Sequence, residues 1–125
     1  MTRNVLAACG VLAALGAAAG EKYPWRGFLL DEARHFFGKA VVTECLDEMK
    51  KADLNVFHWH LTDDQGWRLE LPEFPELTKE GATRPSTPPY GADRGSDGVA
   101  YGPYFYTPAD VREVLDAAQA RGITV

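Results

Sequence analysis

The sequence has 125 residues, enough for one small domain or for part of a larger one. Its composition, 46% hydrophobic and 25% charged, is that of a globular protein and argues against general disorder. The formal net charge is −5 and the basic residues are scattered, so the clustered positive charge of a nucleic-acid-binding protein is missing. The two cysteines, Cys9 and Cys45, predict neither a disulfide framework nor a cysteine-rich metal site.

Residues 1–19 predict a signal peptide. Arg3 precedes an apolar run, and Ala17 to Ala19 are the small residues typical of a cleavage site. The run is interrupted by glycine and is shorter than the roughly 20 apolar residues that cross a bilayer, so no stable membrane span is expected. The alternative is an alanine-rich helix from a preceding domain. We expect export, and we place the folded part at residues 20–125.

Strand and helix patterns alternate after residue 20. A short continuous apolar run at 27–30 predicts a strand that is buried on both faces. Apolar residues at helical spacing predict an amphipathic helix over 39–52. A second strand is predicted over 54–61, where side chains alternate between two faces.

The segment 84–103 is rich in proline and glycine, and it predicts a long irregular loop rather than a domain linker. Helix and strand resume after it. Thr107 is the expected N-cap of a second helix, and Gly122 its expected stop. Residues 123–125 then begin a third strand.

This order of elements predicts a parallel α/β fold. No Gly-x-Gly-x-x-Gly follows either of the first two strands, which argues against a dinucleotide-binding sheet, so we prefer a (β/α)8 TIM barrel. Such a barrel needs about 250 residues, so this sequence supplies about the first three strands. We therefore expect it to be a fragment from the N-terminal part of a barrel.

Titratable side chains gather where the second strand ends. His58 and His60 fall on one face of that strand by simple alternation, and Asp63 and Asp64 follow it. In (β/α)8 barrels the active site lies at the carboxyl ends of the strands. A carboxylate in this position could orient a histidine, accept hydrogen bonds from a sugar hydroxyl, or hold a metal ion, and the spacing does not choose among these.

Four segments, in order and with natural spacing, resemble the family 20 glycoside hydrolases, the β-N-acetylhexosaminidases. They are RGFLLDEARHFF, NVFHWHLTDDQGWRLE, FPELTKEGA and FYTPADVREVLDAAQARGITV. The resemblance implies a barrel enzyme without a cofactor that removes terminal β-linked N-acetylglucosamine or N-acetylgalactosamine from glycans. It also implies a substrate-assisted retaining mechanism, in which the acetamido oxygen of the substrate attacks the anomeric carbon.

The resemblance further implies roles for Arg26 and Asp63. Arg26 matches an arginine that binds sugar hydroxyls; Asp63 matches an aspartate that supports the catalytic acid through a histidine outside this sequence. The Asp–Glu pair that orients the acetamido group and supplies the acid is expected beyond the end of the sequence, so this chain alone is expected to be inactive. For Asp31, Arg34 and His35 a pocket wall is possible, and we favour an ion pair that braces the loop.

Two alternatives stay open. His58 and His60 could be metal ligands of a zinc-dependent barrel hydrolase, although the family resemblance assigns no metal. The chain could also belong to a non-catalytic carbohydrate-binding protein that keeps the fold and lacks the acid. An adjacent Asp–Glu pair further along the chain would favour the enzyme.

Overall fold

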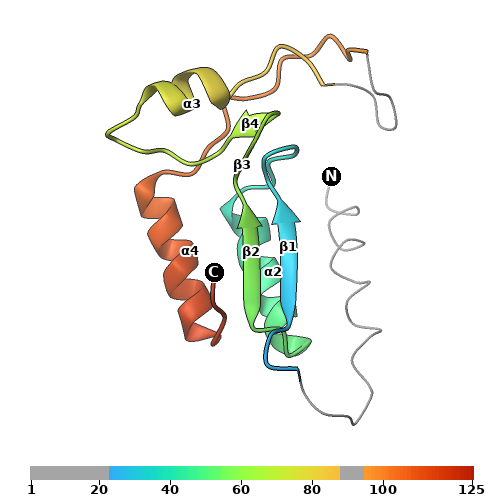
Figure 1. Ribbon diagram of the computed structural model, residues 1–125, viewed down its shortest axis with the longest axis vertical. Coiled ribbons are helices and arrows are strands. Elements are labelled where there is room, and N and C mark those ends of the chain that lie inside the picture. Colours follow the sequence, from blue (N-terminus) through green and yellow to red (C-terminus); the bar gives the residue numbers. More distant parts are fainter. Residues whose placement is uncertain (1–22, 88–94) are drawn as a thin grey trace. The chain divides into compact units, whose positions relative to one another are not determined.

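The computed structural model describes residues 23–87 and 95–125 (Figure 1). The predicted signal peptide lies outside the described residues. These residues form two compact units. The first unit comprises 23–30, 37–59 and 112–125, and the second comprises 31–36, 60–87 and 95–111.

Two strands, β1 (Gly27–Asp31) and β2 (Val56–His60), form a sheet in which both run in the same direction (Figure 1). Both strands were predicted. The third predicted strand is reduced to one parallel bridge, between Val56 and Thr124. The amide of Phe57 donates to the carbonyl of Thr124 at 2.7 Å, and the amide of Thr124 donates to the carbonyl of Asn55 at 3.0 Å.

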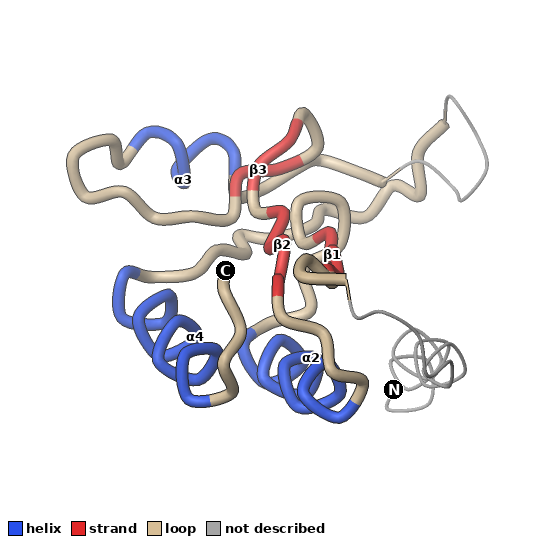
Figure 2. The backbone as a smooth tube through the Cα atoms, turned by 60° about the horizontal axis from the view of Figure 1, so that its bottom comes forward, coloured by secondary structure: helices blue, strands red, loops and turns tan. Residues whose placement is uncertain are grey.

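The helices α2 (Lys39–Lys51) and α4 (Pro108–Ala120) confirm the two predicted helices, and they lie beside each other (Figures 1 and 2). Two ion pairs link them, from Lys39 of α2 to Glu113 of α4 at 2.6 Å and from Arg121, directly after α4, to Asp47 of α2 at 2.7 Å. The apolar faces of the first unit meet in a core. Its buried residues are Leu30, Val42, Cys45, Leu46, Met49, Phe57, Val114, Ala118 and Ile123.

The start of α4 is capped as predicted. The amide of Asp110 donates to the hydroxyl oxygen of Thr107 at 3.2 Å, and the amide of Thr107 donates to the Asp110 carboxylate at 3.1 Å. This reciprocal pair satisfies amides that the first helical turn leaves without an acceptor.

The second unit contains three elements that the sequence patterns did not predict. A tight antiparallel hairpin joins β3 (Thr62–Asp63) to β4 (Gly66–Trp67), and α3 (Glu76–Gly81) follows. Two-residue strands are too short to show a period of two. The described residues of 84–103 form no helix or strand beyond the antiparallel bridge between Arg84 and Tyr101, as an irregular loop requires.

The described residues thus form a mixed α/β structure, which is the predicted fold class at its coarser level. In this part of the chain, no helix has the length and apolar character needed to cross a membrane.

Candidate active site

A buried arginine organises the second unit. Arg68 is 1% exposed, and its guanidinium donates to four main-chain oxygens. Burial, its largest perturbation, lowers the pKa of Arg68, yet an arginine stays charged in proteins, so its N–H groups need acceptors. The acceptors are the carbonyls of Glu32 at 3.2 Å, Ala33 at 2.9 Å, Ala82 at 2.8 Å and Tyr104 at 3.2 Å.

A second buried polar contact lies in the same unit. Glu32 is fully buried, and the hydroxyl of the buried Tyr106 donates to its Oε1 at 2.8 Å. This contact holds the carboxyl of Glu32 inside the unit. Glu32 is therefore a structural residue, and it cannot meet a substrate.

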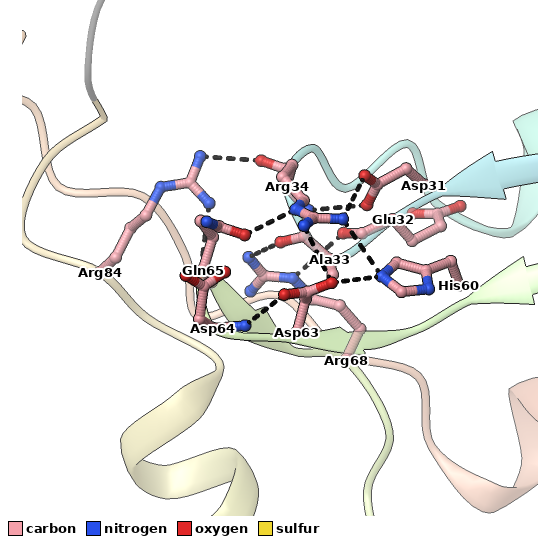
Figure 3. A network of polar contacts seen from close by, with 10 residues as sticks. All are labelled: Asp31, Glu32, Ala33, Arg34, His60, Asp63, Asp64, Gln65, Arg68 and Arg84. Carbon is pink, nitrogen blue, oxygen red and sulfur yellow. Dashed lines mark hydrogen bonds and ion pairs between the residues drawn. The ribbon is translucent and has the colours of Figure 1, made fainter. Parts of the chain in front are cut away.

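The side chains of Asp31, Arg34, His60 and Asp63, called here the Asp63 cluster, meet where β1 and β2 end (Figure 3). One amino group of Arg34, Nη2, lies 3.0 Å from Oδ2 of Asp63, and the other, Nη1, lies 3.0 Å from Oδ2 of Asp31. Nε2 of His60 lies 2.7 Å from the same oxygen of Asp63. Nη1 of Arg34 lies 3.3 Å from the same nitrogen of His60. Since a carboxylate only accepts, the shorter contact with Asp63 is a hydrogen bond when Nε2 carries the proton.

Asp63 is held as a carboxylate. The amide of Asp64 donates to its Oδ1 at 2.8 Å, and this bond, followed by the bond from His60 and the charge of Arg34, lowers the pKa of Asp63 from 3.8 to about 2. At neutral pH the side chain is therefore an acceptor and an electrostatic anchor, and it is no proton donor. Its side chain is 27% exposed and that of Arg34 is 48% exposed, so both can meet a ligand.

The ion pair predicted among Asp31, Arg34 and His35 is confirmed for the first two residues, and it extends to Asp63. The ring of His35 lies 5.9 Å from that of Tyr101. The contact between Asp63 and His60 was not predicted from the sequence. Its signal is the i, i+3 spacing of a histidine at a strand end and a carboxylate in the hairpin that follows.

Arg26 has its own set of contacts. It belongs to the first unit, where its Nε donates to the carbonyl of Asp53 at 2.6 Å and its Nη1 donates to the carbonyl of Tyr23. Its Nη2 also lies 3.5 Å from the Asp53 carboxylate. All three nitrogens of its guanidinium thus contact neighbouring residues.

A metal centre gains no support in the part of the chain that the structure describes. No group of three or more metal-ligating side chains gathers there. Nε2 of His60 is engaged by Asp63, and His58 is exposed on the same strand. The zinc alternative therefore lacks a third ligand among the described residues.

Parallel strands with polar side chains after their carboxyl ends are the layout of α/β enzymes. Residues 23–125 match the model of glycosyl hydrolase family 20, catalytic domain, and the chain therefore belongs to glycoside hydrolase family 20.

The chain is similar to proteins that are named as hexosaminidases. The chain is 40% identical over 104 residues to the beta-hexosaminidase subunit alpha of Bos taurus, an alignment that covers 83% of this chain and 17% of the relative. It is 41% identical over 104 residues to the beta-N-acetylhexosaminidase of Cellulomonas fimi, covering 83% of this chain and 18% of that protein.

The chain is also similar to a solved structure of the same family. The GH20 exo beta-N-acetylglucosaminidase from Vibrio harveyi, in complex with N-acetylglucosamine, superposes with a TM-score of 0.71 at 38% identity. The match covers 84% of this chain and 16% of that one. The chain thus spans less than a fifth of the length of these relatives.

Proposed function

We propose that residues 23–125 are the N-terminal part of a β-N-acetylhexosaminidase catalytic domain, and that β1, β2 and the segment at Thr124 are the first strands of its (β/α)8 barrel. The proposed reaction removes terminal β-linked N-acetylhexosamine from glycans, with the acetamido oxygen of the substrate as nucleophile and net retention at the anomeric carbon. The family match and the names of the relatives support this proposal.

The general acid is proposed to come from a further segment of that domain. The sequence contains two adjacent Asp–Glu pairs, at 31–32 and 47–48. Glu32 is fully buried, and Glu48 pairs with Lys51 at 2.7 Å along α2. Neither carboxyl is placed to protonate a glycosidic oxygen.

The observation that carries the proposal is the state of Asp63. It is a partly exposed carboxylate at the end of β2, held by a main-chain amide, a histidine and an arginine. Such a carboxylate can hold the imidazole ring of a histidine in one orientation. It also stabilises the positive charge of that ring when the ring takes up a proton during the reaction. We propose that Asp63 supports the catalytic acid in this way and contributes to the substrate-binding surface.

Two arginines are candidates for binding the sugar hydroxyls. The sequence resemblance assigns Arg26 to them, and that role stays a prediction. Arg34 is the better candidate, because it follows the carboxyl end of β1 and lies beside Asp63, whereas Arg26 precedes β1. The side chain of Arg34 is also 48% exposed, against 23% for that of Arg26. A guanidinium suits two neighbouring hydroxyls because its N–H groups form a planar fork.

We also propose that the protein is exported, on the composition of residues 1–19. N-terminal sequencing of the mature protein from its producing cells tests this proposal. A mature chain that retains the first nineteen residues would contradict it.

The function is tested by a graft, in which residues 23–125 replace the matching segment of the Cellulomonas fimi enzyme. The graft should hydrolyse an aryl N-acetyl-β-glucosaminide and leave the corresponding aryl β-glucoside intact, because only the first carries the acetamido nucleophile. A folded graft without turnover would contradict the proposed role of this segment in the reaction. The carbohydrate-binding alternative is decided separately, by whether an adjacent Asp–Glu pair lies further along the natural chain. Activity that is lost on chelation of zinc and restored by zinc would favour the metal-dependent one.

The same graft shows which of the two arginines, Arg34 or Arg26, binds the sugar. Arg34→Lys should raise KM strongly, since an ammonium replaces two parallel hydrogen bonds by one. Arg26→Lys should leave KM unchanged and lower the melting temperature, because its contacts lie within its own unit. The reverse pattern would restore Arg26 to the sugar site.

A further inference from the structure

Three consecutive main-chain oxygens in the loop that carries Arg34 accept hydrogen bonds from arginine side chains. The carbonyls of Glu32 and Ala33 accept from Arg68, at 3.2 and 2.9 Å, and the carbonyl of Arg34 accepts from Nη2 of Arg84 at 2.9 Å. We call residues 31–36 the site loop. A loop whose carbonyls point at fixed cationic donors has fewer main-chain conformations than one that faces water.

The two arginines are fixed in turn by a single aromatic ring. The Cζ atom of Arg84 lies 4.0 Å from the ring centroid of Tyr101, and that of Arg68 lies 5.5 Å from it. Both distances are within the range of cation–π attraction. The hydroxyl of Tyr101 also accepts from the amide of Phe36 at 2.6 Å, so the ring is tied to the far end of the site loop.

Close packing against the β3–β4 hairpin fixes the position of the Arg68 guanidinium. A Cβ atom on Gly66 would lie 2.2 Å from Nη2 of Arg68 and 2.8 Å from the carbonyl oxygen of Ala33. The hairpin thus approaches the guanidinium so closely that only glycine fits. Arg84 donates to the carbonyl of Gln65 as well, at 3.4 Å, which links the same hairpin to the base of the long loop.

We propose that Arg68 and Arg84 are positioning residues of the sugar site. They hold the main chain of the site loop, and thereby set the place of the Arg34 guanidinium against Asp63. This role rests on the proposed function, in which Arg34 and Asp63 meet the substrate. Neither arginine touches the substrate, and both act through the loop.

A lysine in place of either arginine keeps the positive charge but lacks the planar set of several N–H donors. Its single ammonium group could reach one carbonyl, whereas each arginine joins several acceptors at once. The site loop should then fluctuate, and Arg34 should spend less time at Asp63. Misplacement of a binding group by about 1 Å can cost on the order of 10²-fold in rate, so a loop that is only loosened still has a measurable effect.

The test uses NMR of the 125-residue chain, and it needs no turnover. Two amides report on the site loop: that of Arg34, which donates to Asp31 at 3.1 Å, and that of Phe36. In Arg68→Lys and in Arg84→Lys both should exchange with solvent about tenfold faster or more, as expected for local opening. The titration midpoint of the Asp63 carboxyl should rise, because the nearby positive charge is lost part of the time.

Arg121→Lys is the matched control. Arg121 also donates to a main-chain carbonyl, that of Ala117 at 2.7 Å, and to a carboxylate, that of Asp47 at 2.8 Å, but it lies in the other unit. It should lower global stability and leave both amide rates and the Asp63 midpoint unchanged. If Arg68→Lys and Arg84→Lys behave like this control while folded, the proposal is wrong.

A milder variant covers the case in which Arg68→Lys does not fold. Tyr101→Phe removes only the hydroxyl that accepts from Phe36, and it should still speed exchange of that amide. Unchanged exchange at Arg34 and Phe36 in folded Arg84→Lys and Tyr101→Phe would overturn the proposal without any result from Arg68.

Kinetics of the graft distinguish positioning from stability. Arg84→Lys should raise KM by about tenfold with little change in kcat, the pattern of lost substrate binding. A fall in kcat at unchanged KM, as from a smaller folded fraction, would contradict the inference. An inactive graft would count against the proposed function alone, since the exchange measurement stands without it.

Discussion

Replacing Gly66 by alanine is a sharp test of the buried arginine. The new methyl group would lie 2.2 Å from Nη2 and 2.5 Å from Cζ of Arg68, and 2.8 Å from the carbonyl oxygen of Ala33. Real Cβ atoms do not approach heavy atoms so closely, so the guanidinium has to move. It cannot move without breaking bonds, because it donates to four main-chain carbonyls.

The expected loss of stability follows from these contacts. Overpacking a well-packed site costs about 1–3 kcal/mol. Displacing a buried charged group from its partners costs about 3–5 kcal/mol, and the two terms overlap because the same movement causes both. We therefore expect Gly66→Ala to lower the free energy of unfolding by about 3–5 kcal/mol, a large share of the roughly 5–15 kcal/mol of a typical domain.

Urea denaturation of the 125-residue chain, followed by circular dichroism, measures this loss. Gly27→Ala is the matched control, because a Cβ there meets its nearest atom at 3.5 Å, an ordinary contact. The control should stay within about 1 kcal/mol of the unmodified chain. If Gly66→Ala also stays within about 1 kcal/mol, Arg68 is not packed against the hairpin as described.

Four further predictions follow from the structure. Tyr106→Phe should lower the free energy of unfolding by about 1–3 kcal/mol because Glu32 loses a buried donor, whereas Tyr104→Phe, on an exposed ring, should change it little; urea denaturation compares the two. Thr107→Ala should cost about 1 kcal/mol by removing the cap of α4, and Thr107→Ser should restore most of it in the same assay. The pKa of Asp63 in the folded chain, about 2, lies below its ordinary 3.8, so its stabilisation is complete above the ordinary value and is lost as the pH falls through this interval. Unfolding of Asp63→Asn should therefore depend less on pH in that range than unfolding of the unmodified chain. The 125-residue chain alone should not hydrolyse an aryl N-acetyl-β-glucosaminide; turnover by the purified chain would show that it contains its own acid.

The sequence patterns were sufficient for the elements that bury an apolar face. The helical spacing of Val42, Cys45, Leu46 and Met49 predicted α2, and all four residues are buried. The sequence patterns were insufficient for the second unit, whose centre is the charged side chain of Arg68. A buried arginine leaves no hydrophobic period, since its acceptors are main-chain oxygens supplied by segments far apart in the sequence.

The candidate site was predicted in part. Asp63 stands out in the sequence because it follows a strand that ends in two histidines, and the structure gathers Asp31, Arg34 and His60 around it. The sequence resemblance selected Arg26 for the sugar, while the rule that sites form at carboxyl ends of strands favours Arg34. For Arg34, after the first strand, the sequence left a pocket wall open and favoured an ion pair.

The most direct test of the account is Asp63→Asn in the graft, with Asp116→Asn on the exposed side of α4 as control. The substitution keeps the size of the side chain and removes the charge that Arg34 and His60 meet. We expect kcat to fall by about 10²–10⁴-fold, the usual contribution of acid–base support, with the graft still folded and the control unchanged. A kcat for Asp63→Asn within about twofold of the unmodified graft would contradict the assignment of Asp63 to catalysis.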